Sequence, residues 1–392
     1  MNTESFERSL RLKSAVLSFP RLVACICAAA LALAAGAPHA QTTVTDLAGR
    51  TVTLPARVER IVLGEGRMLY TIALLEDRAA PLARIVGWQG DLAKFDPQTY
   101  QQYRAKFPDI DRIATIGTTS EASVSPEKVL SLKPDIAVFS LSGHGPSRRN
   151  PLVEQLEKIG VPVVFVDFRE HPLKNTVPSM RVLGKALQRE AQAERFIAFY
   201  EAQKRRVTDV AAKIPAAERP RVLLDVRAGD AGGVLTAGKG SFGELVDLAG
   251  GINVGDSLIP TALGEASLEA VIASRPAIYV ATGYLDPDAK SAGLRVGVRV
   301  DERMARDSLI AVANRRPEIA ALPAVREGRI YGAWHHFYNT PYHIVMLQAL
   351  AKWQHPERFA ALDPLATWRD MHAQFLAVEP TGTFWLAANP PR

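Results

Sequence analysis

Short apolar runs alternate with amphipathic helical stretches along most of the chain. In the first half the apolar runs are RIVLG, ARIVGW, IATIG, DIAVFS and VPVVFVDF, all between residues 60 and 168. Apolar runs of this length, separated by helices, indicate parallel strands whose connecting helices cover both faces of a sheet. Before them, TVTDLAGRTVTLP (43–55) alternates β-branched and polar residues around a turn, which is typical of a β-hairpin.

The alternation is interrupted by REAQAERFIAFYEAQKRRVTDVAAKI (189–214), whose apolar residues recur at spacings of three, four and seven. This pattern predicts a long amphipathic helix, about 37 Å in length. Its predicted buried face consists of Ala193, Phe196, Ile197, Tyr200, Val207, Ala211 and Ile214.

A second α/β series follows in RVLLDVR, GVLTAG, AIYVATG and GRIYGAW. A last helical region covers 340–360, and the tail TGTFWLAANPPR could be held down by Phe384 and Trp385. The fold class predicted from this order is α/β, with two lobes that contain parallel sheets and are joined by one long helix. The predicted segments are a leader at 1–40, lobes at 41–173 and 219–378, a helical linker at 174–218 and a tail at 379–392.

One stretch occurs twice, as PEKVLSLKPD (126–135) and as LEAVIASRPA (268–277). When Glu127 is aligned with Glu269, both copies read Glu, one residue, Val, Leu or Ile, three residues and Pro. Each copy then enters an apolar run, so each lobe would hold one. Glu is a common residue at helix starts, where the helix dipole favours it, and Ser125 or Ser267 could cap each helix.

The N-terminus has the pattern of a secretory signal. Basic residues precede the apolar run LVACICAAALALAAGA, and small residues follow it before Gln41. This order predicts a cleaved signal peptide with cleavage after Ala40, and therefore a secreted protein. A membrane anchor is the alternative, although the run is short for a span. LVAC (22–25) also fits a lipoprotein cleavage pattern.

Composition narrows the function classes. The formal net charge is +6, and Lys and Arg form no long run, so nothing indicates a nucleic-acid partner. Both cysteines, Cys25 and Cys27, lie within the predicted signal. The mature chain would therefore have no disulfide, no thiolate metal site and no cysteine nucleophile.

Several phrases together resemble the periplasmic binding proteins of ABC importers that carry ferric siderophores, haem and cobalamin. Among them are VTDLAGRTVTLPARVERIV, SPEKVLSLKPDIAVF, GELVDLAGGINV, SLEAVIASRPAIYV and LPAVREGRIYG, which occur in the family's order between residues 43 and 335. The resemblance implies two Rossmann-like lobes joined by one rigid helix, with the ligand in the cleft between them. We also expect a monomer without catalytic activity. The stretch 283–316 departs from the family because it is longer than the connection expected there.

The resemblance also implies how the protein meets its membrane partner. In this family each lobe presents an acidic residue at such a helix start, and the pair docks onto arginines of the inner-membrane permease. Alignment of the motifs carries that role to Glu127 and Glu269. A two-fold permease requires two similar docking surfaces, which would explain why the stretch occurs twice.

Ligands of open α/β sheets bind beyond the carboxyl ends of the strands, and that rule selects the candidate residues. The ligand-binding candidates are Arg67, Tyr70, Trp88, Arg148, Arg227, Tyr284, Trp334, His335, His336 and Tyr338. Arginine pairs with carboxylate or catecholate oxygens, and Trp and Tyr offer flat apolar walls. These residue types favour a ferric chelate as cargo, with arginines neutralising its charge and no intrinsic cofactor.

Other interpretations stay open at this point. His335 and His336 could belong to a receptor for a free divalent metal ion, or one of them or Tyr338 could be an axial ligand for haem. A zinc-dependent enzyme is more remote, because neither G-x-S-x-G nor H-E-x-x-H occurs. The arginines at 295, 299, 303 and 306 form either a solvated helix face or an electropositive rim above the ligand.

Overall fold

The computed structural model describes residues 42–229, 233–286 and 293–389. The predicted signal peptide, 1–40, lies outside these ranges. None of the helices within them combines the length and the hydropathy that a membrane span requires. Two five-stranded sheets form the centres of two lobes, so the predicted α/β fold class is confirmed.

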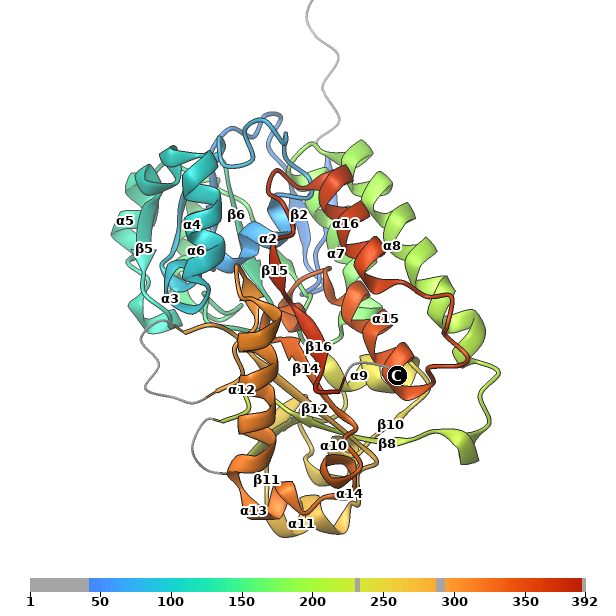
Figure 1. Ribbon diagram of the computed structural model, residues 1–392. Helices are drawn as coiled ribbons and strands as arrows, with labels where there is room; N and C mark the ends of the chain where they lie inside the picture. The colour runs from blue at the N-terminus through green and yellow to red at the C-terminus, as the bar shows by residue number, and fades with distance from the viewer. Residues whose placement is uncertain (1–41, 230–232, 287–292, 390–392) are drawn as a thin grey trace, which may run out of the picture. The chain divides into compact units, whose positions relative to one another are not determined.

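The N-terminal sheet is fully parallel and has the strand order β5-β4-β3-β6-β7. Two of its strands, β5 and β6, are labelled in Figure 1. Its strands are β3 (Ile61–Leu63), β4 (Ile85–Gln89), β5 (Ala114–Gly117), β6 (Ile136–Ser140) and β7 (Val163–Val166). The side chains of β3 and β7 are buried along their whole length, as in a sheet that is covered on both faces. The predicted hairpin is present as β1 (Thr43–Thr45) and β2 (Thr51–Thr53).

Six α-helices connect or flank these strands. They are α2 (Leu69–Ile72), α3 (Asp91–Phe95), α4 (Pro97–Lys106), α5 (Pro126–Ser131), α6 (Pro151–Lys158) and α7 (Pro172–Ala186). Several begin at a proline that follows a capping side chain. Asp96 accepts the N–H of Thr99 ahead of α4, and Asn150 accepts the N–H of Leu152 ahead of α6. Proline fits the first helical position because the N–H it lacks would have no partner in the helix.

The C-terminal sheet has the order β10-β8-β12-β14-β16. Its strands are β8 (Arg221–Asp225), β10 (Ile252–Asn253), β12 (Ile278–Gly283), β14 (Ile330–Trp334) and β16 (Trp385–Ala387). The first four strands of that order pair in parallel, as predicted, whereas β16 pairs antiparallel with β14. The C-terminal tail is therefore an edge strand of the sheet, and Phe384 beside it is 4% exposed.

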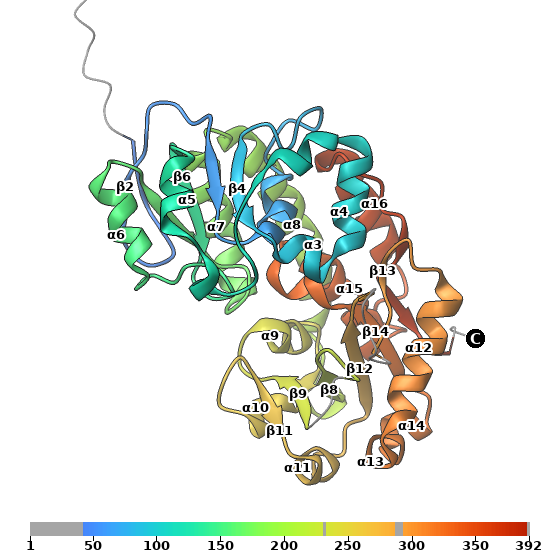
Figure 2. The same ribbon diagram turned by 90° about the vertical axis from the view of Figure 1, so that its left-hand side faces the viewer.

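Further elements surround this sheet. The helices are α9 (Ser241–Leu248), α10 (Gly255–Leu258), α11 (Leu268–Ala273), α12 (Glu302–Arg315), α13 (Pro317–Ala320), α14 (Pro323–Arg326), α15 (His343–Gln354) and α16 (Pro364–Phe375). Two small antiparallel pairs join β9 (Val234–Ala237) to β11 (Leu263–Ala266), and β13 (Gly297–Val298) to β15 (Gly382–Thr383). Figure 2 shows α12 on the same side of the lobe as β14, and it contacts β14 and β16.

The duplicated stretch forms the same structure in both lobes. Ser125 caps α5 and Ser267 caps α11, each by accepting the N–H three residues ahead. The two helices end alike, because Lys133 and Arg275 both have a φ of 45° and both precede a proline. The identical left-handed ends show that the repeat extends beyond a shared helix start.

Arginines at the start of equivalent strands secure these two helix ends. Arg60 precedes β3 and donates to the carbonyl of Leu132, and Arg221 begins β8 and donates to the carbonyl of Ser274. Both carbonyls belong to the last turn of their helix, where backbone acceptors lack helical partners. The two lobes therefore repeat a unit of strand, helix and strand.

The long helix is α8 (Glu190–Ala211), and it buries the face that the sequence predicts. Its 22 residues correspond to about 33 Å. The helix packs against α7 on one side and α15 on the other. In that second contact the hydroxyl of Tyr200 lies 2.8 Å from Nε2 of His343, whose Nδ1–H donates to the carbonyl of Thr340. Burial lowers the pKa of His343 to about 4, so the ring is neutral and accepts the Tyr200 O–H.

The arginine-rich stretch has a structural role at one position. Arg306 on α12 donates to the carbonyls of Ala387 and Ala388, at distances of 3.1 and 2.9 Å. It thereby fastens the C-terminal strand to α12. The sequence analysis offered two interpretations of this arginine, a solvated helix face or a rim above the ligand. Its contacts with the C-terminal strand fit neither.

The continuity of α8 leads to a prediction about motion. A single packed helix resists the wide opening that several flexible crossing segments allow, so closure on ligand should be small. We expect the radius of gyration from X-ray scattering to change little when the predicted ferric siderophore cargo is added. A contraction of several ångströms would show that the lobes move far more than a rigid connection permits.

Candidate functional site

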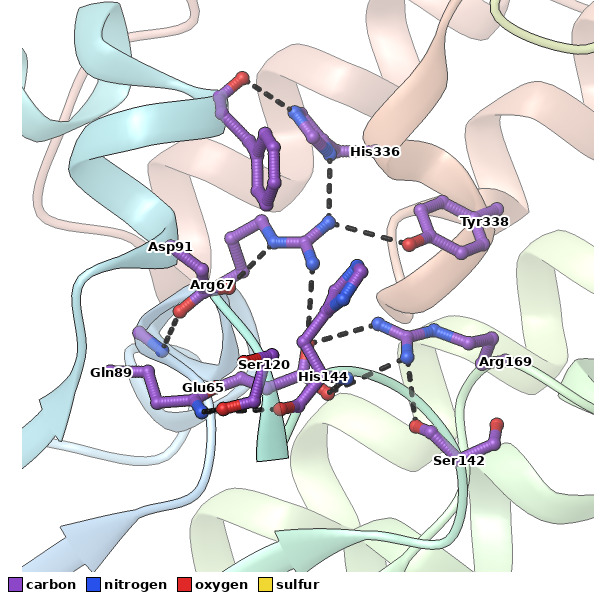
Figure 3. A network of polar contacts seen from close by, with 12 residues as sticks. Glu65, Arg67, Gln89, Asp91, Ser120, Ser142, His144, Arg169, His336 and Tyr338 are labelled. Atoms are coloured by element: carbon purple, nitrogen blue, oxygen red, sulfur yellow. Dashed lines mark hydrogen bonds and ion pairs between the residues drawn. The ribbon is translucent and has the colours of Figure 1, made fainter. Parts of the chain in front are cut away.

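The polar residues labelled in Figure 3 lie at or after the carboxyl ends of strands. Glu65 and Arg67 follow β3, and Asp91 begins α3 shortly after β4. Arg169 follows β7 in a turn that Asp167 organises, because its carboxylate accepts the backbone N–H of Arg169 at 2.9 Å. The parallel strand order brings these loops to one edge of the sheet, as the rule for open α/β sheets predicts.

The C-terminal lobe contributes a short 3₁₀ helix, η5 (His335–Asn339), directly after β14. His336 is 1% exposed and Tyr338 is 7% exposed. Both reach side chains of the N-terminal lobe, although some 270 residues separate them in sequence from their partners. The site is therefore composed of residues from both lobes.

Arg67 is the residue in which these contacts meet. Its Nε donates to Oδ2 of Asp91 at 2.7 Å, and its Nη2 lies 3.3 Å from Oε2 of Glu65. Its Nη1 lies 3.3 Å from the hydroxyl of Tyr338 and 3.4 Å from Nδ1 of His336. Only 3% of the residue is exposed. All three guanidinium nitrogens are thus engaged, two by carboxylates and one by the other lobe.

Glu65 pairs with a second arginine through the same oxygen. Nη2 of Arg169 donates to Oε2 at 3.0 Å, and the backbone N–H of His144 donates to Oε1 at 3.1 Å. Burial acts to raise the pKa of Glu65, but the charges of Arg169 and Arg67 outweigh it and lower the pKa. Glu65 is therefore ionised at neutral pH. We call Glu65, Arg67, Asp91 and Arg169 the arginine–carboxylate cluster.

The same arginines act on the aromatic residues of η5. The Arg169 guanidinium lies 5.0 Å from the centre of the Tyr338 ring. Burial opposes ionisation of Tyr338, but the charges of Arg169 and Arg67 lower its pKa overall. Burial, followed by the charge of Arg67, lowers the pKa of His336 well below its ordinary value. The tyrosine oxygen is therefore favoured as an acceptor, and the imidazole is neutral.

Two glycines permit the close packing around the cluster. A Cβ at Gly66 would lie 2.6 Å from the carbonyl oxygen of Gln89. Gly143 has a φ of 138°, and a Cβ there would lie 1.8 Å from Nη1 of Arg169. A side chain at either position would displace the cluster, so the loops require glycine for steric reasons.

Five of the predicted ligand residues come together in the structure. Arg67, His336 and Tyr338 are in direct contact, as described above. The ring of Tyr284 lies 5.3 Å from that of His336 and 6.2 Å from that of His335. His335 also stacks on Tyr338 at 4.5 Å. An aromatic wall thus adjoins the arginines.

Trp334 and Tyr70 lie behind this wall. Both are 2% exposed, and the Trp334 ring contacts those of Tyr70 and His336 at 5.5 and 5.2 Å. The hydroxyl of Tyr70 donates to Asp96 at 2.7 Å. These two aromatic residues support the histidine rather than adding to the exposed surface of the site.

Three further candidates lie elsewhere or stand apart. Trp88 is a residue of β4, is 4% exposed and belongs to the hydrophobic core, so packing accounts for it. Arg148 is exposed, and its guanidinium lies 3.5 Å from the carbonyl of Ala48 in the N-terminal hairpin turn. Neither residue enters the site proposed below. Arg227 is exposed on the C-terminal lobe, and its charge helps to lower the pKa of His335.

Three residues of the cluster were missed by the sequence analysis. Glu65 and Asp91 each follow a predicted strand within a few residues, so the carboxyl-end rule could have selected them. Arg169 follows the apolar run VPVVFVDF in the same way. The sequence analysis treated arginines as unpaired cations for an anionic ligand, so it did not consider the carboxylates that pair with them.

A direct metal site finds little support in the geometry. Among the described residues, no group of three or more His, Cys, Asp or Glu side chains is arranged to hold a metal ion. The two ring nitrogens of His336 face Arg67 and the carbonyl of Phe95, the latter at 3.1 Å. A metal or haem iron bound by His336 would have to displace one of these partners.

The buried pair of Asp91 and Arg67 should be a large determinant of stability. Asp91→Ala leaves Arg67 with one carboxylate partner fewer in a site closed to solvent. Removal of one partner from a buried ion pair costs about 3–5 kcal/mol. We expect a clearly lower urea midpoint for Asp91→Ala and an unchanged midpoint for Asp111→Ala, whose ion pair with Arg104 is exposed. Equal midpoints for the two variants would contradict this account.

The chain is similar in sequence and in fold to known periplasmic binding proteins. The family model described as periplasmic binding protein matches residues 76–334. A TroA-like periplasmic binding protein, FepB from Veillonella parvula, shares 25% identity and a TM-score of 0.78, covering 88% of this chain and 99% of that one. The molybdate-binding protein MolA of Haemophilus influenzae is 23% identical over 256 residues, which is 60% of this chain and 67% of MolA.

Other solved structures share the fold at lower identity. A protein of an Fe³⁺-hydroxamate transport system from Saccharomonospora viridis is 20% identical with a TM-score of 0.53, covering 80% of this chain and 99% of that one. The family model spans well over half of the chain. The chain therefore belongs to the periplasmic binding protein family, and it is a solute-binding component of an ABC importer rather than an enzyme.

Proposed function

We propose that the protein captures a siderophore-type ferric chelate in the periplasm and delivers it to an inner-membrane permease. The observation that carries this proposal is the meeting of arginine donors and aromatic rings from both lobes around Tyr338. A chelate supplies its own iron ligands, so it requires from the protein hydrogen-bond donors and flat apolar walls. Arg169, Tyr284 and Tyr338 supply both.

The proposed contacts follow from this arrangement. Tyr338 and Tyr284 would face the body of the chelate, with His335 between them. Arg169 and Arg227 would donate to its oxygen atoms, while Arg67, whose guanidinium nitrogens are all engaged, would hold Tyr338 in place. The names of two similar structures point to iron compounds, since one belongs to an Fe³⁺-hydroxamate system and another binds haem.

The signal peptide at 1–40, with cleavage after Ala40, is part of the proposal. It agrees with the periplasmic setting of the family. We also propose that the mature protein acts as a monomer with the permease as its protein partner.

The cargo can be tested by quenching of tryptophan fluorescence, because Trp334 lies 5.2 Å from His336 in the site. The panel comprises ferric siderophores, haem, cobalamin, molybdate, and free Zn²⁺ and Mn²⁺. We expect tight stoichiometric quenching by at least one ferric siderophore, without turnover. Quenching by haem alone, by a free metal ion alone or by molybdate alone would replace the proposed cargo with that compound.

We further propose that Glu127 and Glu269 dock the loaded protein onto the permease. Both are exposed, in the first turns of α5 and α11, which the duplicated unit places equivalently. Glu127 lies 3.1 Å from the hydroxyl of its capping Ser125. Hydrogen bonds from the backbone N–H of Glu269 and, to a lesser extent, from the side chain of Ser267 lower the pKa of Glu269. Both carboxylates are thus presented as charges on a fixed helix end.

Charge reversal tests this docking role. Glu127→Arg and Glu269→Arg should each reduce uptake modestly and the double variant strongly, because ion pairs guide orientation and encounter. Affinity for the cargo should stay normal, since neither residue contacts the site. Glu357→Arg, an exposed glutamate outside both helices, is the control. Normal uptake by the double variant would leave these glutamates with a role in helix capping alone.

A further inference from the structure

The arginine–carboxylate cluster contains two guanidinium groups and two carboxyl groups. Each carboxyl group receives N–H donors, which favour its charged form, and they lower the pKa of Glu65, whereas burial raises the pKa of Asp91. Glu65 accepts from Arg67, Arg169 and the backbone of His144, and Asp91 accepts from Arg67 and the backbone of Gly66. Two guanidinium groups are therefore matched by two carboxylates. Of these two arginines the sequence analysis selected Arg67 alone, as a cation for an anionic cargo, and the structure pairs it with Glu65 and Asp91.

Glu65 is the member that holds both cations. Its Oε2 lies 3.3 Å from Arg67 and 3.0 Å from Arg169, and its side chain is 2% exposed. On their other side the same two guanidinium groups face Tyr338, at the aromatic wall (Figure 3). A ligand at Tyr338 would therefore lie beside two guanidinium groups whose positive charges are already paired with Glu65.

The other titratable groups nearby change this balance little. Burial and the charge of Arg67 lower the pKa of His144, and His335 and His336 are neutral for the same physical reason. Arg227, which the proposed function also places at the cargo, lies outside the cluster and is exposed on the C-terminal lobe, where solvent and salt screen its charge.

Ferric chelates differ in net charge by ligand class. Three singly charged hydroxamates neutralise Fe³⁺, whereas three doubly charged catecholates leave a trianion. Molybdate is a compact dianion. Transfer of a net charge from water into a site without net countercharge is unfavourable, while a neutral complex needs only its hydrogen bonds to be satisfied.

We propose that Glu65 determines specificity by charge, so that the site accepts neutral ferric chelates of the hydroxamate class and excludes tris-catecholates and oxyanions. This inference rests on the proposed transport of ferric chelates. Glu65 does not need to touch the cargo, because it acts by balancing the charges of the two arginines beside Tyr338. The substitution Glu65→Gln preserves shape and one acceptor oxygen but leaves the cluster with a net positive charge.

The test compares dissociation constants of wild type and Glu65→Gln for ferric tris-hydroxamate, ferric tris-catecholate and molybdate. We expect the preference for hydroxamate over catecholate to fall by about tenfold or more, and molybdate affinity to rise by a similar factor. Asp91→Asn removes a charge from the same cluster and should shift selectivity in the same direction if Glu65→Gln folds poorly. Glu121→Gln is the matched control, because Glu121 is held by Ser147 and Asn150 rather than by arginine.

The outcomes separate this inference from the proposed function. Unchanged selectivity in both folded cluster variants would overturn the role of Glu65, and so would a wild type that prefers tris-catecholate. If no ferric chelate binds wild type, the proposed cargo is wrong. In that case the molybdate measurement still tests whether Glu65 sets the charge of the site. A higher molybdate affinity in Glu65→Gln than in wild type supports this role, and an equal or lower affinity refutes it.

Discussion

The shared pairing of Glu65 with Arg67 and Arg169 is the interaction on which the rest of the site depends. Two guanidinium groups cannot be buried next to each other without a counter-charge, because desolvation and mutual repulsion both act against them. One carboxylate oxygen within 3.3 Å of each makes their burial possible. The glycines at 66 and 143 supply the space for that geometry.

The topology of the two sheets brings the residues of the site together. Loops after β3, β4 and β7 arrive at one edge because the sheet is parallel, and η5 comes from the equivalent edge of the second sheet. The cluster in turn fixes Arg67 so that a single nitrogen faces His336 and Tyr338. The contact between lobes is thus set by the same ion pairs that set the charge of the site.

Sequence patterns predicted the fold well and the site in part. The buried face of α8 was predicted because helical periodicity records burial directly, and the tail strand was anticipated only as a strap. Trp88 was expected to follow its strand, whereas β4 extends through Gln89 and places this tryptophan within the strand. The pairing of Glu65 with Arg169 spans 104 residues and depends on tertiary proximity, which no local pattern records.

The position of β16 has a consequence for how the C-terminal lobe is completed. Residues 385–387 pair with β14 after α15 and α16 have intervened, and Arg306 on α12 binds the carbonyls that follow. Until the chain has been made beyond these residues, β14 is an open sheet edge, and open edges are templates for pairing with other chains. The late strand therefore replaces the five-residue edge of β14 with a three-residue edge, and a short edge strand offers other chains less to pair with.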